Sequence, residues 1–261
     1  MDRHSFIQRV KHLYLMNPGA VSSIAYHKLE GFLRESELHH LDGDGRETLY
    51  AIRQRQLTFY WSEQQDRFMV PPEQLQQLES LILHEQHYLL LRRQLSGYSI
   101  DQFYPLFYDH SFQQPAIACE SCYIDGFDFR QELDYEAAAE IITETRTGYT
   151  VTAERVRGWT RDRAFDPTLW LLAREKHSGR PVGVGISCYF APVGEADLDW
   201  FFVRPSHQGQ GVGRMLIAET IARCQPKSKI IRLAGIADGF YQKCGFHRGD
   251  SWYYLKKQRQ R

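Results

Sequence analysis

The chain has 261 residues, of which 43% are hydrophobic and 25% are charged, a composition typical of a folded globular protein and not of a disordered one. Lys plus Arg number 32 and Asp plus Glu number 32, so no global field favours nucleic acid or a membrane surface as a partner. No apolar run approaches the ~20 residues that cross a bilayer, the N-terminus lacks the apolar core of a signal peptide, and the odd number of five cysteines favours reduced thiols, so we expect a cytoplasmic protein.

The length is comfortable for two domains, and Phe112-Gln113-Gln114-Pro115 reads as the linker between them. We therefore expect an N-terminal domain over 1–113 and a second domain over 114–261. The first segment carries 11 basic and 14 acidic side chains, and the remainder carries 21 and 18. The sign of that asymmetry suits an anionic cofactor in the second domain.

In the N-terminal domain, apolar spacing and turn residues predict a mixture of helices and a hairpin. Pro71-Pro72 suits the first turn of a helix. The predicted elements are helices over 6–13 and 24–32, strands over 48–55 and 57–61, a helix over 71–82, a strand over 87–91 and a short helix from 99 to 105.

The second domain alternates between helical and strand patterns, and 177–181 reads as a hairpin turn between two of its strands. This is an α/β (α+β) pattern with a mixed, mostly antiparallel sheet flanked by helices. The predicted elements are strands over 123–129, 169–174, 182–190, 196–203, 229–233 and 251–256, and helices over 134–145, 152–161 and 237–243.

The most informative stretch is Gln208-Gly209-Gln210-Gly211-Val212-Gly213, which follows an apolar strand and precedes a helix. A strand that turns through glycines into a helix offers unpaired backbone N–H groups and the positive end of the helix dipole to a phosphate. Glycine allows the close approach and the unusual dihedral angles. A P-loop is excluded because Arg214-Met215 follows Gly213 instead of Lys-Ser/Thr. A Rossmann fingerprint is disfavoured because the loop comes after an antiparallel hairpin.

The stretch from Val203 to Arg214 resembles the GNAT family, the GCN5-related N-acetyltransferases. The family pattern, Gln/Arg-x-x-Gly-x-Gly/Ala after a strand ending in Val-x-Pro, is filled by Gln208, Gly211 and Gly213. A second family feature, Phe240-Tyr241-Gln242-Lys243-Cys244-Gly245-Phe246, follows one strand later. The resemblance covers roughly 120–257 and implies the GNAT acyl-CoA N-acyltransferase fold there.

The resemblance also implies the cofactor, acetyl-CoA, and the residues that bind it. The backbone from Gln208 through Gly209, Gln210, Gly211, Val212 and Gly213 to Arg214 is expected to hold the pyrophosphate. Main-chain groups of Phe201, Phe202 and Val203 are expected to pair with the pantetheine arm as an added strand would. In the family this strand carries a bulge and separates from its neighbour, here 229–233, which leaves a slot for the thioester.

Acetyl transfer to an amine requires a neutral amine, a polarised thioester carbonyl and a proton for the leaving thiolate. Tyr241 matches the general acid of the family, and its ordinary pKa of about 10 lets it keep a proton at neutral pH. The family often has Asn seven residues before this tyrosine, where Ala234 stands here. Its absence leaves one cofactor hydrogen bond in question.

For the base, family members often place Glu or His where this chain has Asp197 and Asp199. Strand alternation places both carboxylates on one face with Phe201 and Val203, and Trp200 and Phe202 on the other. Two like charges about 7 Å apart among aromatics can raise one pKa. Each aspartate is therefore a candidate base or amine anchor, and the alternative is a surface carboxylate. The amide of Phe202 is the oxyanion donor that the resemblance implies.

The family builds its acceptor site from the first two helices and the last hairpin. The aromatic candidates for that wall suit an amine with an apolar body or a cation, although each also fits core packing. They are Trp159, Phe165, Tyr189, Trp200, Trp252 and Tyr253.

The remaining features are ambiguous. Cys119 and Cys122 form a Cys-x-x-Cys without a second pair of cysteines. The simpler interpretation is two unreactive thiols near a strand, and the alternative is a zinc or redox site. We expect no metal, because His84 and His87 have no acidic partner at fixed spacing. Residues 1–113 are either a degenerate GNAT half or an independent domain that covers the acceptor cleft or mediates a homodimer.

The expected activity is therefore acetyl-CoA-dependent N-acetyl transfer, directly to a primary amine of a small molecule. The sequence leaves two alternatives open, an acetyltransferase for a protein or peptide amine and a non-catalytic acyl-CoA-binding sensor.

Overall fold

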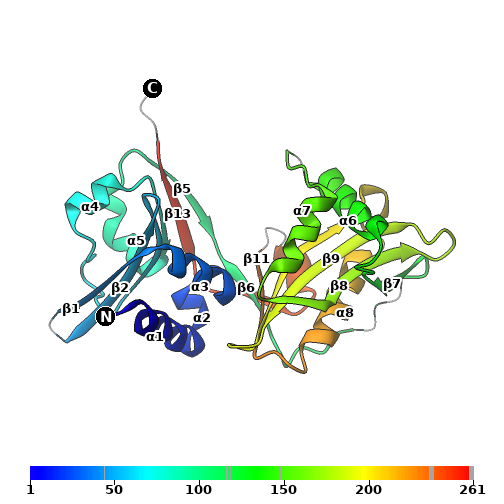
Figure 1. The fold of residues 1–261 in the computed structure, drawn as a ribbon, viewed down its shortest axis with the longest axis horizontal. Coiled ribbons are helices and arrows are strands. Elements are labelled where there is room, and N and C mark those ends of the chain that lie inside the picture. Colours follow the sequence, from blue (N-terminus) through cyan, green and yellow to red (C-terminus); the bar gives the residue numbers. More distant parts are fainter. Residues whose placement is uncertain (44, 116, 118, 147, 235–237, 259–261) are drawn as a thin grey trace. The chain divides into compact units, whose positions relative to one another are not determined.

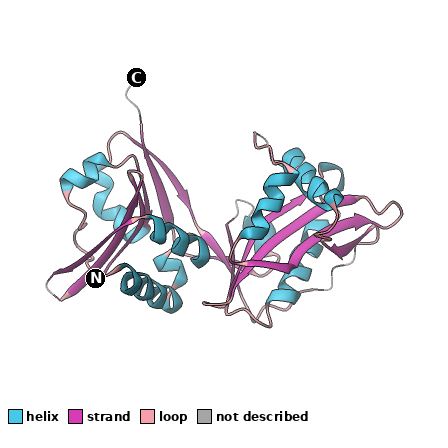
Figure 2. Cartoon of the chain, viewed as in Figure 1, coloured by secondary structure: helices cyan, strands magenta, loops and turns pink. Residues whose placement is uncertain are grey.

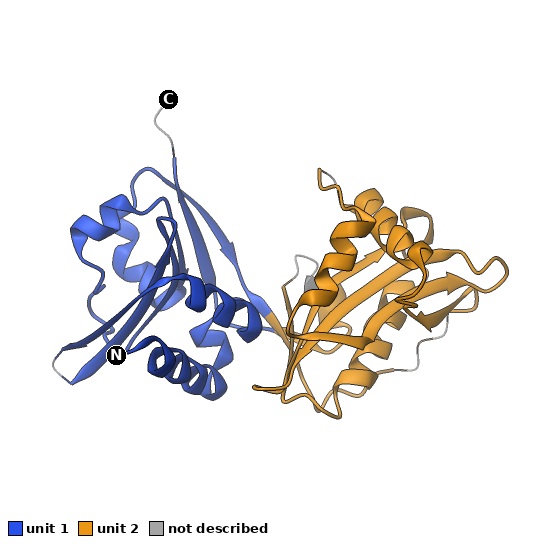
Figure 3. Ribbon diagram, viewed as in Figure 1, with its two compact units in different colours: residues 1–105, 248–261 blue, residues 106–247 orange. Residues whose placement is uncertain are grey.

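The computed structural model describes residues 1–43, 45–115, 117, 119–146, 148–234 and 238–258. The chain forms two compact units, each containing one sheet and its helices (Figure 3). The first unit consists of Met1–Pro105 with Arg248–Arg261, and the second consists of Leu106–His247. These units differ from the expected segments 1–113 and 114–261, because the last strand of the chain completes the sheet of the first unit.

The first unit has a six-stranded sheet in the order β1-β2-β3-β4-β13-β5 (Figure 1). Consecutive strand residues point to opposite faces, and here Phe59 meets Phe6 of α1 while Tyr60 meets His87 of α5. Helices therefore cover both faces. Its elements are α1 (Arg3–Met16), α2 (Pro18–Val21), α3 (Tyr26–Glu35), β1 (Glu37–Gly43), β2 (Arg46–Arg53), β3 (Gln56–Ser62), α4 (Pro72–Gln77), β4 (Ser80–His84), α5 (Glu85–Leu91), a 3-10 turn (Arg92–Gln94), β5 (Tyr98–Phe103) and β13 (Trp252–Lys257).

Three predicted elements of this unit were wrong. The helix expected over 71–82 ends at Gln77, and Leu81 enters β4, where it pairs with Leu57 of β3 and Leu255 of β13. The strand expected over 87–91 is helix α5, and the helix expected from 99 to 105 is strand β5. Short apolar runs fit either structure, and β4 and β5 are strands because they pair with the two edges of β13.

The second unit has a seven-stranded sheet in the order β12-β6-β11-β10-β9-β8-β7, with α6 and α7 on one face and α8 on the other (Figures 1 and 2). The predicted strands and helices up to residue 248 are present, although residue 237, where one helix was expected to start, lies outside the described residues, and β6 and β12 were not predicted. Its elements are β6 (Pro105–Tyr108), β7 (Cys122–Gly126), α6 (Glu132–Thr145), α7 (Ala153–Gly158), a 3-10 turn (Trp159–Arg161), β8 (Phe165–Glu175), β9 (Pro181–Phe190), β10 (Glu195–Val203), a 3-10 turn (Pro205–His207), α8 (Val212–Cys224), β11 (Ile230–Ala234), α9 (Asp238–Gln242) and β12 (Phe246–Arg248).

The segment read as a linker belongs to the second unit. It follows β6, and the Gln114 side chain donates a 2.9 Å hydrogen bond to the carbonyl of Cys244. The strand expected over 251–256 is β13, which lies between β4 and β5 in the first unit. Each sheet therefore contains one strand from the other half of the sequence.

The two sheets share one topology. In each, a central parallel pair, β3 with β4 or β10 with β11, is extended on one side by antiparallel strands. On the other side of that pair, each sheet places one strand from the other half of the sequence and then its remaining edge strand. Among the described residues, the first sheet has no counterpart of β7. The fold is mixed α/β with mostly antiparallel sheets flanked by helices, as expected, and the first unit is a second, incomplete copy of the same arrangement.

In the part of the chain that the structure describes, no helix has both the length and the apolar character needed to span a bilayer.

Candidate active site

The glycine loop lies between β10 and α8, as the sequence predicted. Gly209 and Gly211 have φ angles of 75° and 88°, a region that strains residues with a side chain. No other described atom lies within 4 Å of the position that a Cβ would take at either glycine. Among the described residues, the amides of 209–214 have no protein acceptor. The start of α8 therefore offers its backbone donors to an open surface.

Strand β10 separates from β11 just before this loop. Its parallel pairing with β11 runs from Glu195 to Leu198 and stops there. Its antiparallel pairing with β9 continues to Val203, with a register shift between Leu198 and Trp200 that makes Asp199 a bulged residue. The bulge and the separation expected of this strand are thus confirmed. From residue 199 onward, β10 has one edge that β11 does not cover.

The bulge corrects the predicted faces of β10. Residues that pair directly across strands share a face, and Trp200 and Phe202 pair with Ile186 and Val184, which pack beneath α6 and α7. Asp197 pairs with Cys188, two positions from Ile186 on the same face of β9. Asp197 therefore shares a face with Trp200 and Phe202, and not with Phe201 and Val203 as strict alternation predicted. The extra residue at Asp199 shifts the alternation by one.

One pocket of about 610 Å³ joins the separated strand, the loop and the segment after β11. It contains most of the residues that the sequence singled out for the cofactor, together with Tyr241. It is lined by Thr145, Phe201, Phe202, Val203, His207, Gln208, Gly209, Gly211, Gly213, Arg214, Leu216, Phe240, Tyr241 and Lys243.

Two predicted cofactor residues do not line this pocket with their side chains. Val212 is 1% exposed and packs into the core beneath α8. The side chain of Gln210 turns back and donates to the carbonyl of Ser206 at 3.0 Å. Their backbone amides nevertheless belong to the run of free donors, so a backbone site does not require their side chains.

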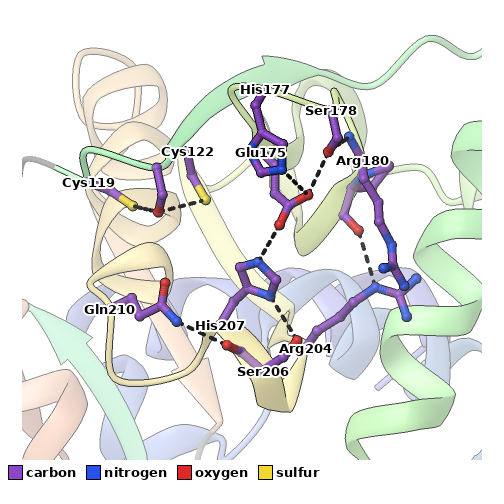
Figure 4. Close-up of polar contacts among 12 residues, drawn as sticks. Cys119, Cys122, Glu175, His177, Ser178, Arg180, Arg204, Ser206, His207 and Gln210 are labelled. Carbon is purple, nitrogen blue, oxygen red and sulfur yellow. Dashed lines mark hydrogen bonds and ion pairs between the residues drawn. The ribbon is translucent and has the colours of Figure 1, made fainter.

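The polar side chains around the loop are held in place. Gln208 Nε2 donates to the carbonyl of Val203 at 2.9 Å, which closes the turn. His207 contacts Glu175 Oε1 through Nε2 at 2.9 Å and Ser206 Oγ through Nδ1 at 2.9 Å (Figure 4). The Nε of Arg214 is buried and has no partner among the described residues. Together with Lys243, Arg214 brings positive charge to a pocket whose amides already favour an anion.

Tyr241 lies on α9, with its ring against Phe240 and Phe246 at centroid distances of 5.1 and 6.1 Å. Burial raises the pKa of its hydroxyl, and the nearby Cys244 thiol raises it further. The group therefore stays protonated throughout the neutral range and is suited to donating a proton.

The two aspartates have different surroundings. Asp197 is 5% exposed and pairs across the sheet with Cys188 and, on the β11 side, with Arg232. Asp199 is exposed at the bulge. Neither lines the pocket described above, so the structure does not bring either carboxylate to Tyr241 within that cavity.

The aromatic candidates for an acceptor wall separate into groups. Trp200 stacks on Trp159 at 4.7 Å and on Tyr149 at 5.8 Å, on the face of α6 and α7. Phe165 packs against Trp170 in the core, and the Tyr189 hydroxyl donates to the carbonyl of Lys227. The other two candidates, Trp252 and Tyr253, belong to β13 of the first unit.

Sequence reasoning missed three residues of the pocket. Thr145 is the last residue of α6 and carries no motif that could have indicated it. Phe240 lies within the second motif and Leu216 lies in α8 just after the first, but their apolar side chains suggested core packing. The ring of Phe240 also lies 3.2 Å from the position that a Cβ on Gly213 would take, which explains the glycine there.

Comparison with known proteins assigns this fold and pocket to a class. Residues 166–248, which contain the loop and Tyr241, match the family model of the acetyltransferase (GNAT) domain. This match identifies residues 166–248 as a GNAT acetyltransferase domain, of a family whose cosubstrate is acetyl-CoA. The expected class of enzyme is thereby confirmed.

Solved structures extend the likeness to both units. The GCN5-related N-acetyltransferase from Sphaerobacter thermophilus matches with a TM-score of 0.58 at 21% identity, over 71% of this chain and 63% of that one, so this chain spans less than two thirds of its length. A GNAT-family acetyltransferase from Colwellia psychrerythraea has a TM-score of 0.63 at 12% identity, over 99% and 98% of the two chains. A tandem GNAT protein from the clavulanic acid biosynthesis pathway has a TM-score of 0.58 at 13% identity, over 97% and 94%. Such identities establish the fold. Among curated protein sequences, none matches.

Proposed function

We propose that the second unit transfers an acetyl group from acetyl-CoA directly to a primary amine of a small molecule, through a ternary complex. The observation that carries this proposal is the single pocket in which the free amides of 209–214, the uncovered edge of β10 and the Tyr241 hydroxyl meet.

The residues present suit the cofactor along its length. The amides from Gly209 to Arg214 bind the pyrophosphate at the start of α8, and Arg214 and Lys243 add positive charge. The free edge of Phe201 to Val203 accepts the pantetheine arm in the place that β11 has left. Because Gln208 already donates to the carbonyl of Val203, the pantetheine amides pair chiefly with the other main-chain groups of this edge.

The chemistry then depends on three groups. Tyr241 gives its proton to the leaving thiolate, and its raised pKa keeps that proton available. The amide of Phe202 donates to the carbonyl oxygen as negative charge develops there. Asp199 takes the amine proton, directly or through water, because the bulge leaves this residue exposed where β10 and β11 separate. Asp197, buried opposite Arg232, is the less suitable base.

A small acceptor is favoured by the stack of Trp159, Trp200 and Tyr149. Trp200 and Phe202 lie on the same face of β10, so the stack adjoins the edge that would carry the thioester. Arg146 already lies over Tyr149 and Trp200, so the remaining aromatic surface suits the apolar body of a small amine rather than a cationic group.

We further propose one catalytic site per chain. In the first unit, the connection from β3 to α4, residues 63–71, contains no glycine, and α4 has only 6 residues. Phe68 from this connection stacks on Tyr60 of β3 at 4.2 Å. The first unit therefore keeps the fold of the second without its phosphate-binding loop.

Replacement of Tyr241 with Phe tests the proposal. We expect the rate of acetyl transfer to fall by on the order of 10²-fold or more, because the leaving thiolate loses its acid, while CoA affinity changes little. The measurements are thiol release with a panel of small amines and calorimetric binding of CoA. Tyr123→Phe, which removes a phenolic hydroxyl from an exposed position outside the pocket, is the matched control.

Two results would overturn the assignment. Binding of CoA without thiol release on any amine would indicate a sensor, and release only with peptide or protein amines would indicate that class of acceptor.

A further inference from the structure

Two cysteines that the acetyl-transfer chemistry does not use lie beside the cofactor pocket. Cys119 and Cys122 are 8% and 2% exposed, and the chain bends at Glu120 and Ser121 between them. The Ser121 hydroxyl lies 3.5 Å from Cys119 Sγ and 3.6 Å from Cys122 Sγ (Figure 4). The two thiols therefore contact the same hydroxyl, in a Cys-x-x-Cys, the spacing found in redox-active dithiols.

The two thiols differ in acidity. Burial raises the pKa of Cys119, but hydrogen bonds from Ser121 and Cys122 outweigh burial and hold it below its ordinary value. Burial raises the pKa of Cys122, and the charges of Cys119 and Glu175 raise it further. Cys224 and Cys244 also have raised pKa values. Cys119 is thus suited to attack and Cys122 to resolve, the division of roles found in reactive dithiols.

The pair shares an apolar cluster with the pocket wall. Cys119 and Cys122 pack with Val212 and Leu216 in the first turns of α8, and Phe201 and Val203 join the same cluster from β10. Leu216, Phe201 and Val203 also line the pocket. A shift of the sulfur atoms is therefore transmitted to the strand edge and helix start that hold the proposed cofactor.

A polar connection runs to the loop as well. Cys122 of β7 pairs with Glu175 of β8. The same glutamate accepts from Ser178 at 2.5 Å and contacts Nε2 of His207 at 2.9 Å, and His207 lines the pocket (Figure 4). The strand position of Cys122 thus fixes the carboxylate that orients this histidine.

We propose that Cys119 and Cys122 are a thiol–disulfide modification site whose oxidation weakens cofactor binding. The oxidant class is a low-molecular-weight disulfide. The Cys119 thiolate attacks one sulfur of that disulfide, which breaks its S–S bond, forms a mixed disulfide and releases one thiol. The Cys122 thiolate then attacks the Cys119 sulfur and releases the second thiol. Two protein thiols are oxidised and one external disulfide is reduced to two thiols.

The expected direction follows from geometry. A disulfide requires the sulfur atoms to lie about 2.05 Å apart, so the two separate thiols must move toward each other. The start of β7 and the packing under α8 must both move. We expect CoA affinity to fall by about tenfold or more, the change that ~1.4 kcal/mol of lost interaction produces.

The test uses the full chain, fully reduced, before and after equilibration with glutathione disulfide. Peptide mapping by mass spectrometry identifies the disulfide, and calorimetry measures CoA affinity in each form. We expect a Cys119–Cys122 disulfide, the loss of affinity, and recovery of both after reduction. Cys122→Ser should retain glutathione on Cys119, because the resolving thiol is missing. Cys224→Ala, buried near the far end of α8, should respond like the unmodified sequence.

The regulatory part rests on the proposed function, and the two fail differently. If the reduced protein does not bind CoA, the proposed function and the coupling both fail, and mapping still decides whether the thiols pair. If CoA binds and no Cys119–Cys122 disulfide forms, the modification site is refuted. If the disulfide forms and affinity is unchanged, the coupling to the pocket is refuted.

Discussion

His87 is a buried histidine of the first unit and has no proposed catalytic role. Its surroundings disfavour the protonated, charged form of the ring. It is 3% exposed, its ring meets the edge of Tyr60 at 4.7 Å, and its Nδ1 has no partner among the described residues. Burial and, to a smaller extent, the neighbouring His84 together lower its pKa to about 4. The folded unit therefore holds this ring neutral, while the unfolded chain protonates it near its ordinary pKa of 6.5.

The stability of the first unit should consequently depend on acid. As pH falls from about 6.5 to about 4, the unfolded chain binds a proton that the folded unit refuses, so the free energy of unfolding drops. The contribution of His87 is complete at low pH and amounts to about 3 kcal/mol at most. In His87→Phe this part of the drop should vanish. Urea unfolding near pH 7 and near pH 4.5 measures it.

The matched control is His12→Gln, on an exposed position of α1, which should lose stability in acid as the unmodified chain does. If His87→Phe loses as much as the control, the ring is not held neutral by burial.

At the scale of elements, Arg204 holds the connection from β10 to the glycine loop in place through hydrogen bonds and ion pairs. This residue is 8% exposed, its amide donates to the carbonyl of Val182 at 2.8 Å, and its Nε donates to the carbonyl of Pro181 at 3.2 Å. Its other nitrogens reach Glu140 at 3.0 Å and Glu144 on α6. One side chain thus joins the end of β10, the start of β9 and the helix that carries Thr145.

Replacement of Arg204 with Met should loosen this junction. The loss of several hydrogen bonds, some to charged groups, is expected to lower the free energy of unfolding by about 1–3 kcal/mol. CoA affinity should also fall, because only the 3-10 turn Pro205–His207 separates Arg204 from the glycine loop. Both glutamates are largely exposed, so Glu144→Gln alone should cost only ~0–1 kcal/mol. Chemical denaturation and calorimetric CoA titration measure the two effects.

Glu219→Gln provides the comparison, because it breaks an exposed helical ion pair with Arg223 on α8 and should change neither quantity appreciably. An Arg204→Met protein with unchanged CoA affinity would show that the junction does not position the loop.

The sequence predicts a helix, strand or loop correctly where neighbouring residues determine that element. The glycine loop, β10 and α8 follow from glycine dihedrals and apolar periodicity, and all three lie where they were expected. The faces of β10 were not predictable from alternation, because the bulge at Asp199 lies in the pairing of β10 with β9. The position of Asp197 therefore depends on tertiary structure that alternation within one strand cannot reveal.

At the scale of the whole molecule, the order of strands along the sequence does not show which strands pair in each sheet. β5 pairs with β13, and these partners, such as Ile100 and Leu255, lie in opposite halves of the chain. Local patterns could suggest a strand near the C-terminus, but its partners depend on contacts across the whole sequence. The same exchange explains why residues 112–115 looked like a linker and are part of the second unit.

The exchange of strands predicts that the first unit depends on the end of the chain. In β13, Leu255 is 0% exposed and Trp252 is 3% exposed, with its indole N–H donating to the carbonyl of Gly19 at 2.9 Å. Removal of such side chains costs about 2–5 kcal/mol each, which together matches the whole stability of a typical domain. Truncation after Arg248 should therefore unfold the first unit, and hydrogen exchange should show lost protection in β4 and β5 while β9 and β10 stay protected. Truncation after Lys257, which keeps β13, should leave both sheets protected. Continued protection of β4 and β5 after removal of β13 would mean that the first sheet is stable without this C-terminal strand.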